Sequence, residues 1–298
     1  MNITHYDLFA GIGGFSLALE EVFNEAKINH IFCEWQHFPS AVLKKHWPNG
    51  IFYGDIADLI ADTNSKRHKS SFTKSETERR SNLCSGARGD KNETLTILTG
   101  GFPCQPFSHA GRRKGTADDR YQWPNMFRVI QNVKPDWVIA ENVRGLVTWN
   151  DGMVLEQVCV DLESEDYEVQ PFIIPAVAVN APHRRDRVWI IAHTEDKRNR
   201  AGFREIQGED GEISKRNDNA KPGYSNWCRD WREVATATCN ARMDDGLSRE
   251  VDGISYSFAK WRNESIKAYG NAIVPQVAME IFRAIKMTVE LNYTISCK

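Results

Sequence analysis

The sequence predicts a doubly wound α/β fold with a mostly parallel sheet and a small, irregular lobe. Short apolar stretches alternate with helical patterns along residues 1–192. The first three stretches run into candidate ligand positions, at Phe9, Glu34 and Asp55. Because the carboxyl ends of parallel strands meet at one edge of a sheet, we expect these residues to line a common site.

Hydrophobic periodicity places the elements in order. Strands are predicted at 3–9, 28–33, 51–53, 96–99, 136–140, 167–174 and 187–192. Apolar residues at helical spacing predict helices around 15–23, 123–133, 154–162 and 277–288. Pro135 ends the second of these helices. From residue 193 to about 255 the pattern gives way to charged, irregular sequence.

Composition excludes several classes of protein. The formal net charge of −2 excludes a uniformly basic nucleic-acid coat, although a local cationic cleft is still allowed. The seven cysteines are scattered and never spaced as C-x-x-C, which argues against a disulfide framework or a zinc site. No leader pattern and no run of 18 apolar residues occurs. We therefore expect a cytoplasmic monomer that binds neither membrane nor metal.

The stretch 63–92 differs from its surroundings. Residues 66–91 hold eight basic and three acidic residues, a local charge of +5. Such a segment buries too little apolar surface to order itself, so we expect a flexible insertion. It is either a solvated loop or an electrostatic arm for nucleic-acid phosphates.

Cys104 is the candidate nucleophile. It follows the apolar stretch 96–99 within a Gly- and Pro-rich turn, which holds a thiol at the mouth of a sheet instead of in its core. An isolated cysteine is more often an inert core residue. Here Glu141-Asn142-Val143, at the end of another strand, favours the reactive alternative.

The first strand and helix are joined by a glycine-rich turn that admits a cofactor close to the backbone. Glu34, 23 positions after Gly11, could accept hydrogen bonds from both ribose hydroxyls. Gly13 and Gly14 are adjacent, so the spacing departs from G-x-G-x-x-G. The turn therefore suits a nucleoside cofactor without a pyrophosphate better than a dinucleotide, and a nicotinamide oxidoreductase has this turn alone in its favour.

Five segments in order resemble the motifs of the cytosine carbon-5 DNA methyltransferases. They are DLFAGIGGFSLALE at 7–20, GFPCQPFS at 101–108, ENV at 141–143, the segment 183–188 and GNAIVPQVA at 270–278. The resemblance implies the sheet of S-adenosylmethionine-dependent methyltransferases. It also implies a catalytic and cofactor-binding domain at 1–192, a target-recognition region at 193–255 and a C-terminal segment at 256–298 that returns to the first domain.

The resemblance assigns catalytic roles. Cys104 matches the nucleophile that adds to carbon 6 of cytosine, and Glu141 matches the acid that engages ring nitrogen 3. Arg185 and Arg187 match a pair of arginines, of which we expect the first to contact the cytosine carbonyl oxygen. His183 stands where many relatives have glutamine. A solvated charge run is the alternative for this arginine segment.

S-adenosylmethionine is the implied methyl donor, with no metal. The resemblance places its glycine-rich pocket at Phe9, Gly11, Gly13 and Gly14, the ribose at Glu34, the adenine at Trp35, Asp55 and Ile56, and further contacts at Pro103 and Asn271. Trp35 could equally be a core residue.

Double-stranded DNA is the implied substrate, and the target base must be flipped out of the duplex to reach Cys104. We expect the loop after the nucleophile to close over DNA, with Ser108, Arg112, Arg113 and Lys114 near phosphates. A restriction endonuclease acting on the same site is a further expected partner. The alternatives are an RNA cytosine-5 methyltransferase on the same scaffold and a catalytically silent DNA-binding regulator.

Overall fold

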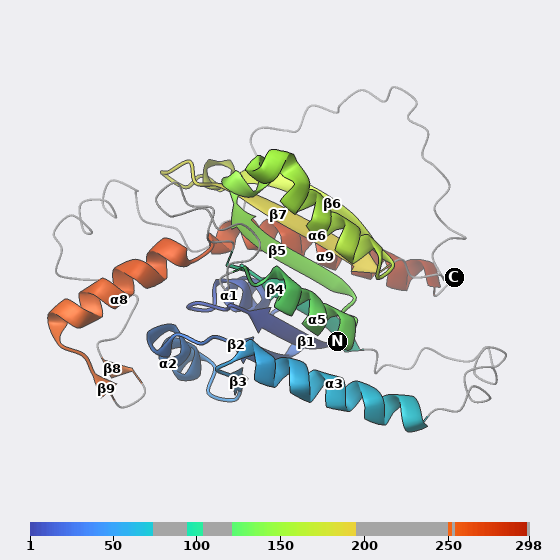
Figure 1. The fold of residues 1–298 in the computed structure, drawn as a ribbon, viewed down its shortest axis with the longest axis horizontal. Coiled ribbons are helices and arrows are strands. Elements are labelled where there is room, and N and C mark those ends of the chain that lie inside the picture. The colour runs from blue at the N-terminus through green and yellow to red at the C-terminus, as the bar shows by residue number, and fades with distance from the viewer. Residues whose placement is uncertain (74–93, 104–120, 195–249, 252–253, 297–298) are drawn as a thin grey trace. The chain divides into compact units, whose positions relative to one another are not determined.

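The computed structural model describes residues 1–73, 94–103, 121–194, 250–251 and 254–296 (Figure 1). All of them belong to one compact unit, Met1–Glu195 with Arg249–Lys298. The expected recognition region lies almost entirely outside the described residues, so its boundaries stay a prediction.

A seven-stranded sheet forms the centre of this unit (Figure 1). Its strands are, from edge to edge, β3 (Ile51–Tyr53), β2 (Lys27–Cys33), β1 (Asn2–Leu8), β4 (Thr94–Gly100), β5 (Trp137–Val143), β7 (Asp186–Thr194) and β6 (Tyr167–Pro175). The first five are parallel, and β7 runs antiparallel to both β5 and β6. The predicted α/β class with a mostly parallel sheet is confirmed.

Two apolar cores cover the two faces of the sheet, because successive side chains of a strand point to opposite sides. On one face, α1 (Gly14–Val22) and α9 (Pro275–Ser296) pack over Ile3, Ile97 and Ile139. The other face carries α3 (Ile56–Thr73), α5 (Trp123–Val133) and α6 (Met153–Glu163), which pack against Leu98 and Val138. Both strand faces are therefore buried, as a parallel sheet requires.

Three further helices and a short hairpin escaped the periodicity analysis. They are α2 (His37–His46), α3, α8 (Phe258–Asn271) and the pair β8 (Glu250–Val251) and β9 (Ile254–Ser255). Short 3-10 turns lie at Arg144–Val147, Trp149–Gly152 and Ala176–Val179. Within the described part of the chain, no helix is both long and apolar enough to cross a bilayer.

The flexible insertion was expected to begin at residue 63, and this predicted boundary is wrong. Helix α3 continues to Thr73, so the opening part of the stretch 63–92 is helical. Thr63 is buried, its hydroxyl donates to the Leu59 carbonyl at 2.8 Å, and it accepts from Asn132 Nδ2 at 3.1 Å. These contacts anchor the helix to α5. The remainder of the stretch, 74–92, lies outside the described residues.

Candidate active site

The carboxyl edge of the sheet gathers most of the described candidate residues. β1, β2, β3, β4 and β5 all end at this edge, because they are parallel. The Ala10 amide donates to the Cys33 carbonyl at 3.2 Å, and the Glu34 amide donates to the Tyr53 carbonyl at 3.0 Å. These bonds extend the strand order into the loops, so the first three loops are fixed beside one another.

The glycine-rich turn after β1 is tightly constrained. Phe9, Gly11 and Gly13 all have positive φ angles, of 53°, 55° and 84°. An added Cβ at Gly13 would lie 2.4 Å from the Trp47 ring, and one at Gly14 would lie 2.7 Å from Ile273 Cγ1. Only glycine fits these two positions. At Gly11, in contrast, the Cβ direction is open.

Glu34 lies directly against this turn. Its Oε2 accepts from the Gly11 amide at 2.8 Å, and its Oε1 accepts from the Gln36 amide at 2.8 Å. Burial raises the pKa of Glu34, and the bonds from backbone amides oppose that rise. The Trp35 amide also interacts with this carboxyl, so three of its four lone pairs face backbone amides and one remains for a ligand hydroxyl.

Trp35 is 75% exposed, so the alternative that it is a core residue is wrong. A large aromatic side chain seldom stays so open on a folded surface without a partner. It follows Glu34 directly, and thus a flat apolar surface stands beside a carboxyl acceptor. The open space at Gly11, the Glu34 acceptor and the Trp35 surface fit a nucleoside group.

The other candidates for the cofactor site differ in surroundings. Asp55 is exposed and its Oδ1 accepts from the Ala57 amide at 2.9 Å, which caps α3. Ile56 is buried and packs into the core under the sheet. The Pro103 carbonyl accepts from the Gln122 amide at 3.2 Å, and Asn271 is the exposed last residue of α8. Among these four, Asp55 and Asn271 therefore present free side-chain surface.

Glu141 is the main acid of the described site, and its carboxyl group is almost fully buried within β5. Its Oε1 lies 2.9 Å from Arg187 Nε, and a Cβ added at Gly101 would lie 3.3 Å from its Oε2. Burial raises the pKa of Glu141 to about 7, although Arg187 and Arg185 favour the charged form. The acid can therefore be either protonated or ionised near neutral pH.

Asn142 anchors the chain that leads to Cys104. Its Nδ2 donates to the Phe102 carbonyl at 3.0 Å, and its Oδ1 accepts from the Val143 amide at 2.9 Å. Phe102 is buried. The neighbourhood of Gly101 and Phe102 is thus fixed next to Glu141. Cys104, Ser108, Arg112, Arg113 and Lys114 lie outside the described residues.

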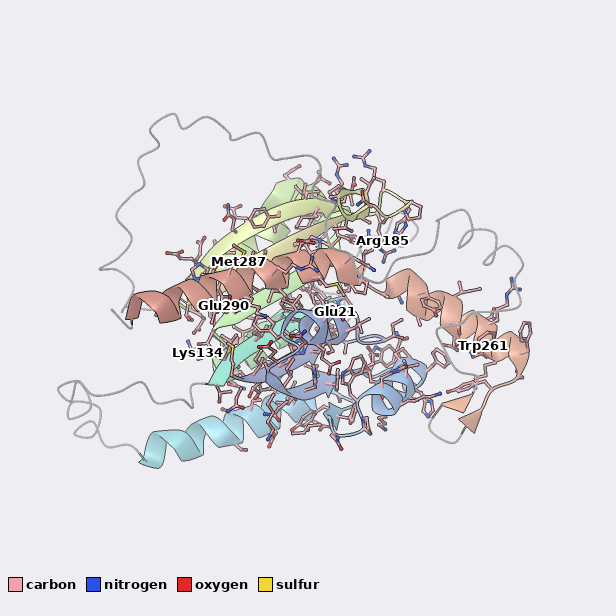
Figure 2. The ribbon with its side chains drawn as sticks, turned by 180° about the vertical axis from the view of Figure 1, so that it is seen from behind. Glu21, Lys134, Arg185, Trp261, Met287 and Glu290 are labelled. Carbon is pink, nitrogen blue, oxygen red and sulfur yellow. The ribbon has the colours of Figure 1, made fainter. Side chains whose placement is uncertain are left out.

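The two arginines of the 183–188 segment have different partners. Arg187 pairs with Glu141. Arg185, labelled in Figure 2, instead donates from Nη2 to the carbonyls of Gly270 and Ala272, at 2.9 and 2.6 Å. Arg185 also has a positive φ of 36°. The expected base contact thus falls on an arginine that here holds the junction between α8 and α9. His183 is exposed.

A buried polar cluster of His5, Asp7 and His30 lies behind the glycine-rich turn and was not predicted from the sequence. A polar residue within an apolar strand is its only sequence signal. Among the described residues, no group of three or more His, Cys, Asp or Glu side chains could hold a metal ion.

The chain is similar to several known methyltransferases. The type II methyltransferase M.Sau96I of Staphylococcus aureus is 40% identical over 109 residues, 35% of this chain and 25% of that protein. M.PspPI of Psychrobacter sp. is 32% identical over 188 residues, covering 62% and 38%. M.HhaI of Haemophilus parahaemolyticus is 28% identical over 191 residues, covering 64% and 49%. The chain therefore spans half or less of the length of these curated relatives.

Among solved structures, the Entamoeba histolytica methyltransferase EhMeth is 15% identical, with 65% of this chain and 54% of that chain covered at a TM-score of 0.45. The S. pombe Dnmt2 methyltransferase is 19% identical, with 65% and 50% covered at 0.42. The family described as C-5 cytosine-specific DNA methylase matches residues 3–250. Because that match covers most of the sequence, the chain belongs to the C-5 cytosine-specific DNA methylase family.

Proposed function

We propose that this chain transfers a methyl group from S-adenosylmethionine to carbon 5 of a flipped-out cytosine in duplex DNA. The observation that carries the proposal is the buried Glu141 carboxyl, paired with Arg187 at 2.9 Å. It lies at the same sheet edge as the glycine-rich turn and Glu34. A proton donor for a pyrimidine ring thus stands close to a nucleoside-binding turn.

Carbon 5 of cytosine is a poor nucleophile, so the ring must first be activated. The Cys104 thiolate would add at carbon 6, and the displaced electron pair would move toward ring nitrogen 3. Protonated Glu141 would neutralise that charge by donating its proton to nitrogen 3. Carbon 5 then attacks the methyl group that the bound cofactor supplies.

Elimination completes the reaction. A base removes the proton from carbon 5, the bond between Sγ and carbon 6 breaks, and the electron pair returns to the thiolate. Glu141 takes its proton back from nitrogen 3. Because the Glu141 pKa is about 7, the side chain can donate and accept with little energetic cost at neutral pH.

Arg187 is the arginine best placed to act with Glu141 on the base. Its guanidinium group presents five N–H donors in a fixed plane. Nε contacts the acid and Nη1 donates to the Asp186 carbonyl at 2.9 Å, so further donors remain for the base. Arg185 spends its NH2 group on two backbone carbonyls, so we assign it the role of holding the Gly270–Ala272 backbone. This assignment departs from the expectation that Arg185 contacts the base.

The relatives are named as type II methyltransferases, which favours a restriction-modification role. We extend this to the present chain as part of the proposal, with residues 193–255 as the region that selects the DNA sequence. A restriction endonuclease cutting the same sequence would be its natural companion.

A trapping experiment tests the proposal. Duplex DNA containing 5-fluorocytosine should form a covalent adduct in the presence of S-adenosylmethionine, because fluorine at carbon 5 cannot leave as a proton. Cys104→Ser should abolish the adduct, whereas Cys159→Ser, a half-buried thiol on α6, should not. Bisulfite sequencing of host DNA after expression gives the site. A chain that modifies tRNA but not DNA, or neither, would overturn the proposal.

A further inference from the structure

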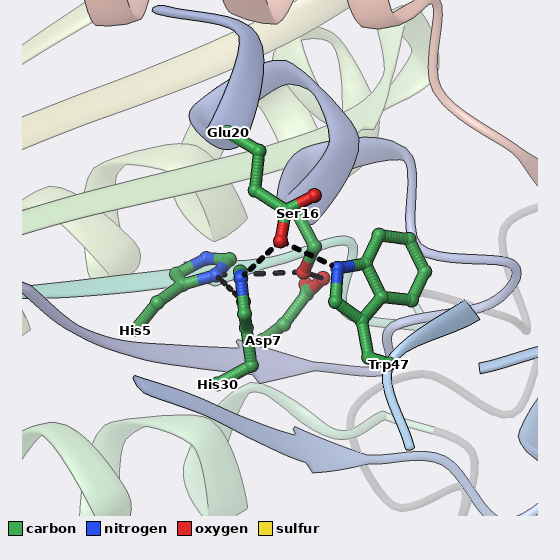
Figure 3. Close-up of polar contacts among 6 residues, drawn as sticks. All are labelled: His5, Asp7, Ser16, Glu20, His30 and Trp47. Carbon is green, nitrogen blue, oxygen red and sulfur yellow. Dashed lines mark hydrogen bonds and ion pairs between the residues drawn. The ribbon is translucent and has the colours of Figure 1, made fainter. Parts of the chain in front are cut away.

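A chain of polar side chains lies behind the glycine-rich turn, and Figure 3 draws all of its members except Thr99. It has five short contacts: Glu20 Oε1 to His30 Nε2 at 3.1 Å, His30 Nδ1 to His5 Nδ1 at 3.1 Å, His5 Nε2 to Thr99 Oγ1 at 2.9 Å, Thr99 Oγ1 to Asp7 Oδ1 at 2.9 Å, and Asp7 Oδ2 to Ser16 Oγ at 2.8 Å. A sixth, longer contact joins Ser16 Oγ to His5 Nδ1 at 3.4 Å. Because it uses the same His5 nitrogen as the His30 contact, one N–H can serve both, and it adds no proton to the count. These residues come from β1, β2, β4 and α1.

Most of this chain has no access to solvent. His5, Asp7, Ser16 and Thr99 are fully buried and His30 is 7% exposed, whereas the Glu20 side chain is 44% exposed. Because no bulk water can complete a missing bond inside, each contact needs one proton of its own. The geometry of this hydrogen-bond chain therefore fixes the number of protons that it holds.

The count leaves one proton to be found. Two neutral imidazoles and two hydroxyl groups supply four protons, but there are five contacts. With both Asp7 and Glu20 ionised, one contact would bring two acceptors together. One extra proton satisfies all five contacts.

Burial favours Asp7 as the place of this proton. An ionised Glu20 keeps contact with solvent and also accepts from Trp47 Nε1 at 2.9 Å, whereas an ionised Asp7 would be a buried charge. Protonated Asp7 can donate to Thr99, Thr99 to His5, His5 to His30, and His30 to Glu20. All bonds then point the same way, toward the surface.

The electrostatics agree with this arrangement. Burial raises the pKa of Asp7 to about 7, and the nearby Glu34 carboxyl adds to the rise. Burial lowers the pKa of His5 well below its usual value, with His30 adding to the effect. For His30 burial lowers the pKa more than Glu20 raises it. Neutral imidazoles and a protonated Asp7 are the forms that satisfy the hydrogen-bond chain.

We propose that Asp7 is a positioning residue for the cofactor-binding turn and works in its protonated form, held by the hydrogen-bond chain through Thr99, His5 and His30 to Glu20. The identity of the cofactor rests on the function proposed above. Asp7 is the last residue but one of β1 and Ser16 lies in the first turn of α1, so their bond ties together the two elements that flank the turn. At the far end of the chain, Glu20 holds Trp47, whose ring lies against Gly13.

Loss of the proton should loosen the turn. An ionised Asp7 would be a buried charge facing Glu34, and one contact of the chain would lose its proton. Among the described residues, the polar groups that face Asp7 or the two histidines are Glu34 directly after β2, Glu20 and Ser16 from α1, and Thr99 from β4. None of these supplies a compensating cation, so cofactor affinity should fall as the pH rises above about 7.

The test compares the wild-type chain with Asp7→Asn, because an asparagine amide imitates the protonated acid: it donates to Thr99 and accepts from Ser16. Affinity for S-adenosylhomocysteine is measured by titration calorimetry between pH 6 and 9. In the wild type we expect the affinity to fall, approaching about tenfold per pH unit where only the protonated form binds. Asp7→Asn should keep the affinity at pH 6.5 and lose this slope. Glu21→Gln, an exposed neighbour of Glu20 on α1, should behave as wild type (Figure 2).

A second measurement detects the proton directly. Wild-type binding at pH 8, measured in buffers with different ionisation enthalpies, should take up close to one proton more than Asp7→Asn binding, or more than wild-type binding at pH 6. Ionisation of the ligand's own amino group is common to both proteins and cancels in their difference. Binding without this uptake would overturn the inference and leave the proposed function intact. If the protein binds no S-adenosylhomocysteine at any pH, both this inference and the proposed function are overturned.

Discussion

Alanine at Gly13 should be far more costly than alanine at Gly11, although both glycines have positive φ angles in the same turn. At Gly13 the new Cβ would lie 2.4 and 2.6 Å from two atoms of the Trp47 ring and 3.0 Å from Leu43 Cδ2. At Gly11 no atom lies within 4 Å of the new Cβ. The pair therefore separates backbone strain from overpacking.

The magnitudes follow from these contacts. A left-handed conformation costs an alanine about 1–2 kcal/mol, and this applies at both positions. Overpacking adds about 1–3 kcal/mol, at Gly13 alone. Trp47 cannot swing away cheaply, because its Nε1 donates to Glu20 and its ring packs on Phe32 with centroids 5.4 Å apart. We expect a loss of about 2–5 kcal/mol for Gly13→Ala and about 1–2 kcal/mol for Gly11→Ala.

Urea unfolding followed by far-ultraviolet circular dichroism measures both losses, provided that the dependence on urea concentration is unchanged. Calorimetry with S-adenosylhomocysteine gives the complementary result, because the open Cβ direction at Gly11 faces the proposed ligand. Gly11→Ala should therefore weaken the binding of S-adenosylhomocysteine, although it costs only about 1–2 kcal/mol of folding stability. Equal losses of stability in the two variants would refute the packing argument.

Three further predictions concern other contacts. Glu141→Gln should slow single-turnover methyl transfer by about 10²–10⁴-fold while cofactor binding persists. Because Cys104 is needed as the thiolate and Glu141 as the acid, the ratio of the wild-type rate to the Glu141→Gln rate, which removes the thiolate dependence, should fall as pH rises above the Glu141 pKa of about 7, and a constant ratio would contradict the role. Arg185→Met should lower the free energy of unfolding in urea by about 1–3 kcal/mol, because it removes two hydrogen bonds to the α8–α9 junction. Arg184→Met should change that free energy little, because the exposed Arg184 side chain pairs with Asp186 at the surface, and similar losses in the two variants would argue against the junction role. Tyr167→Phe should lower the free energy of unfolding by about 1–3 kcal/mol, because the buried hydroxyl donates to the Pro135 carbonyl at 2.7 Å, and an unchanged midpoint in urea would show that the carbonyl finds another donor.

The sheet was predictable because its strands are short apolar runs with clear ends. The predicted strand 51–53 coincides with β3, and the predicted helix 123–133 coincides with α5. Glu141 was expected after a strand ending at Ala140, but β5 continues to Val143 because β7 pairs with it there. That pairing is a tertiary contact between segments far apart in the sequence, so periodicity could not reveal it.

Two of the missed helices, α8 and α2, lack a clear helical signal in the sequence for different reasons. Helix α8 buries only Trp261, Ser265 and Ala268, and the rest of its surface is polar or exposed. Helix α2 carries Pro39 in its first turn, where proline is tolerated, although inside an apolar pattern proline usually signals an end. Tertiary packing sustains both helices.

The buried polar chain depends on strand register, which the sequence does not state. His5 and His30 are direct partners in the parallel ladder between β1 and β2. Read separately, each is a polar residue in a strand of mixed character. Similarly, nothing in the spacing of Arg185 and Arg187 indicates that the first would reach the Gly270 carbonyl, 85 positions away along the chain.

The reversed direction of β7 has a consequence for how this protein could be re-engineered. Its first residues pair with the end of β5 beside Glu141, and its last residues pair with the start of β5, so the ladder is complete before the chain leaves Thr194. A segment grafted between Thr194 and β8 would leave every rung of that ladder unbroken. On the proposal that residues 193–255 select the DNA sequence, chimeras joined at these two points should combine the chemistry of one parent with the target preference of the other.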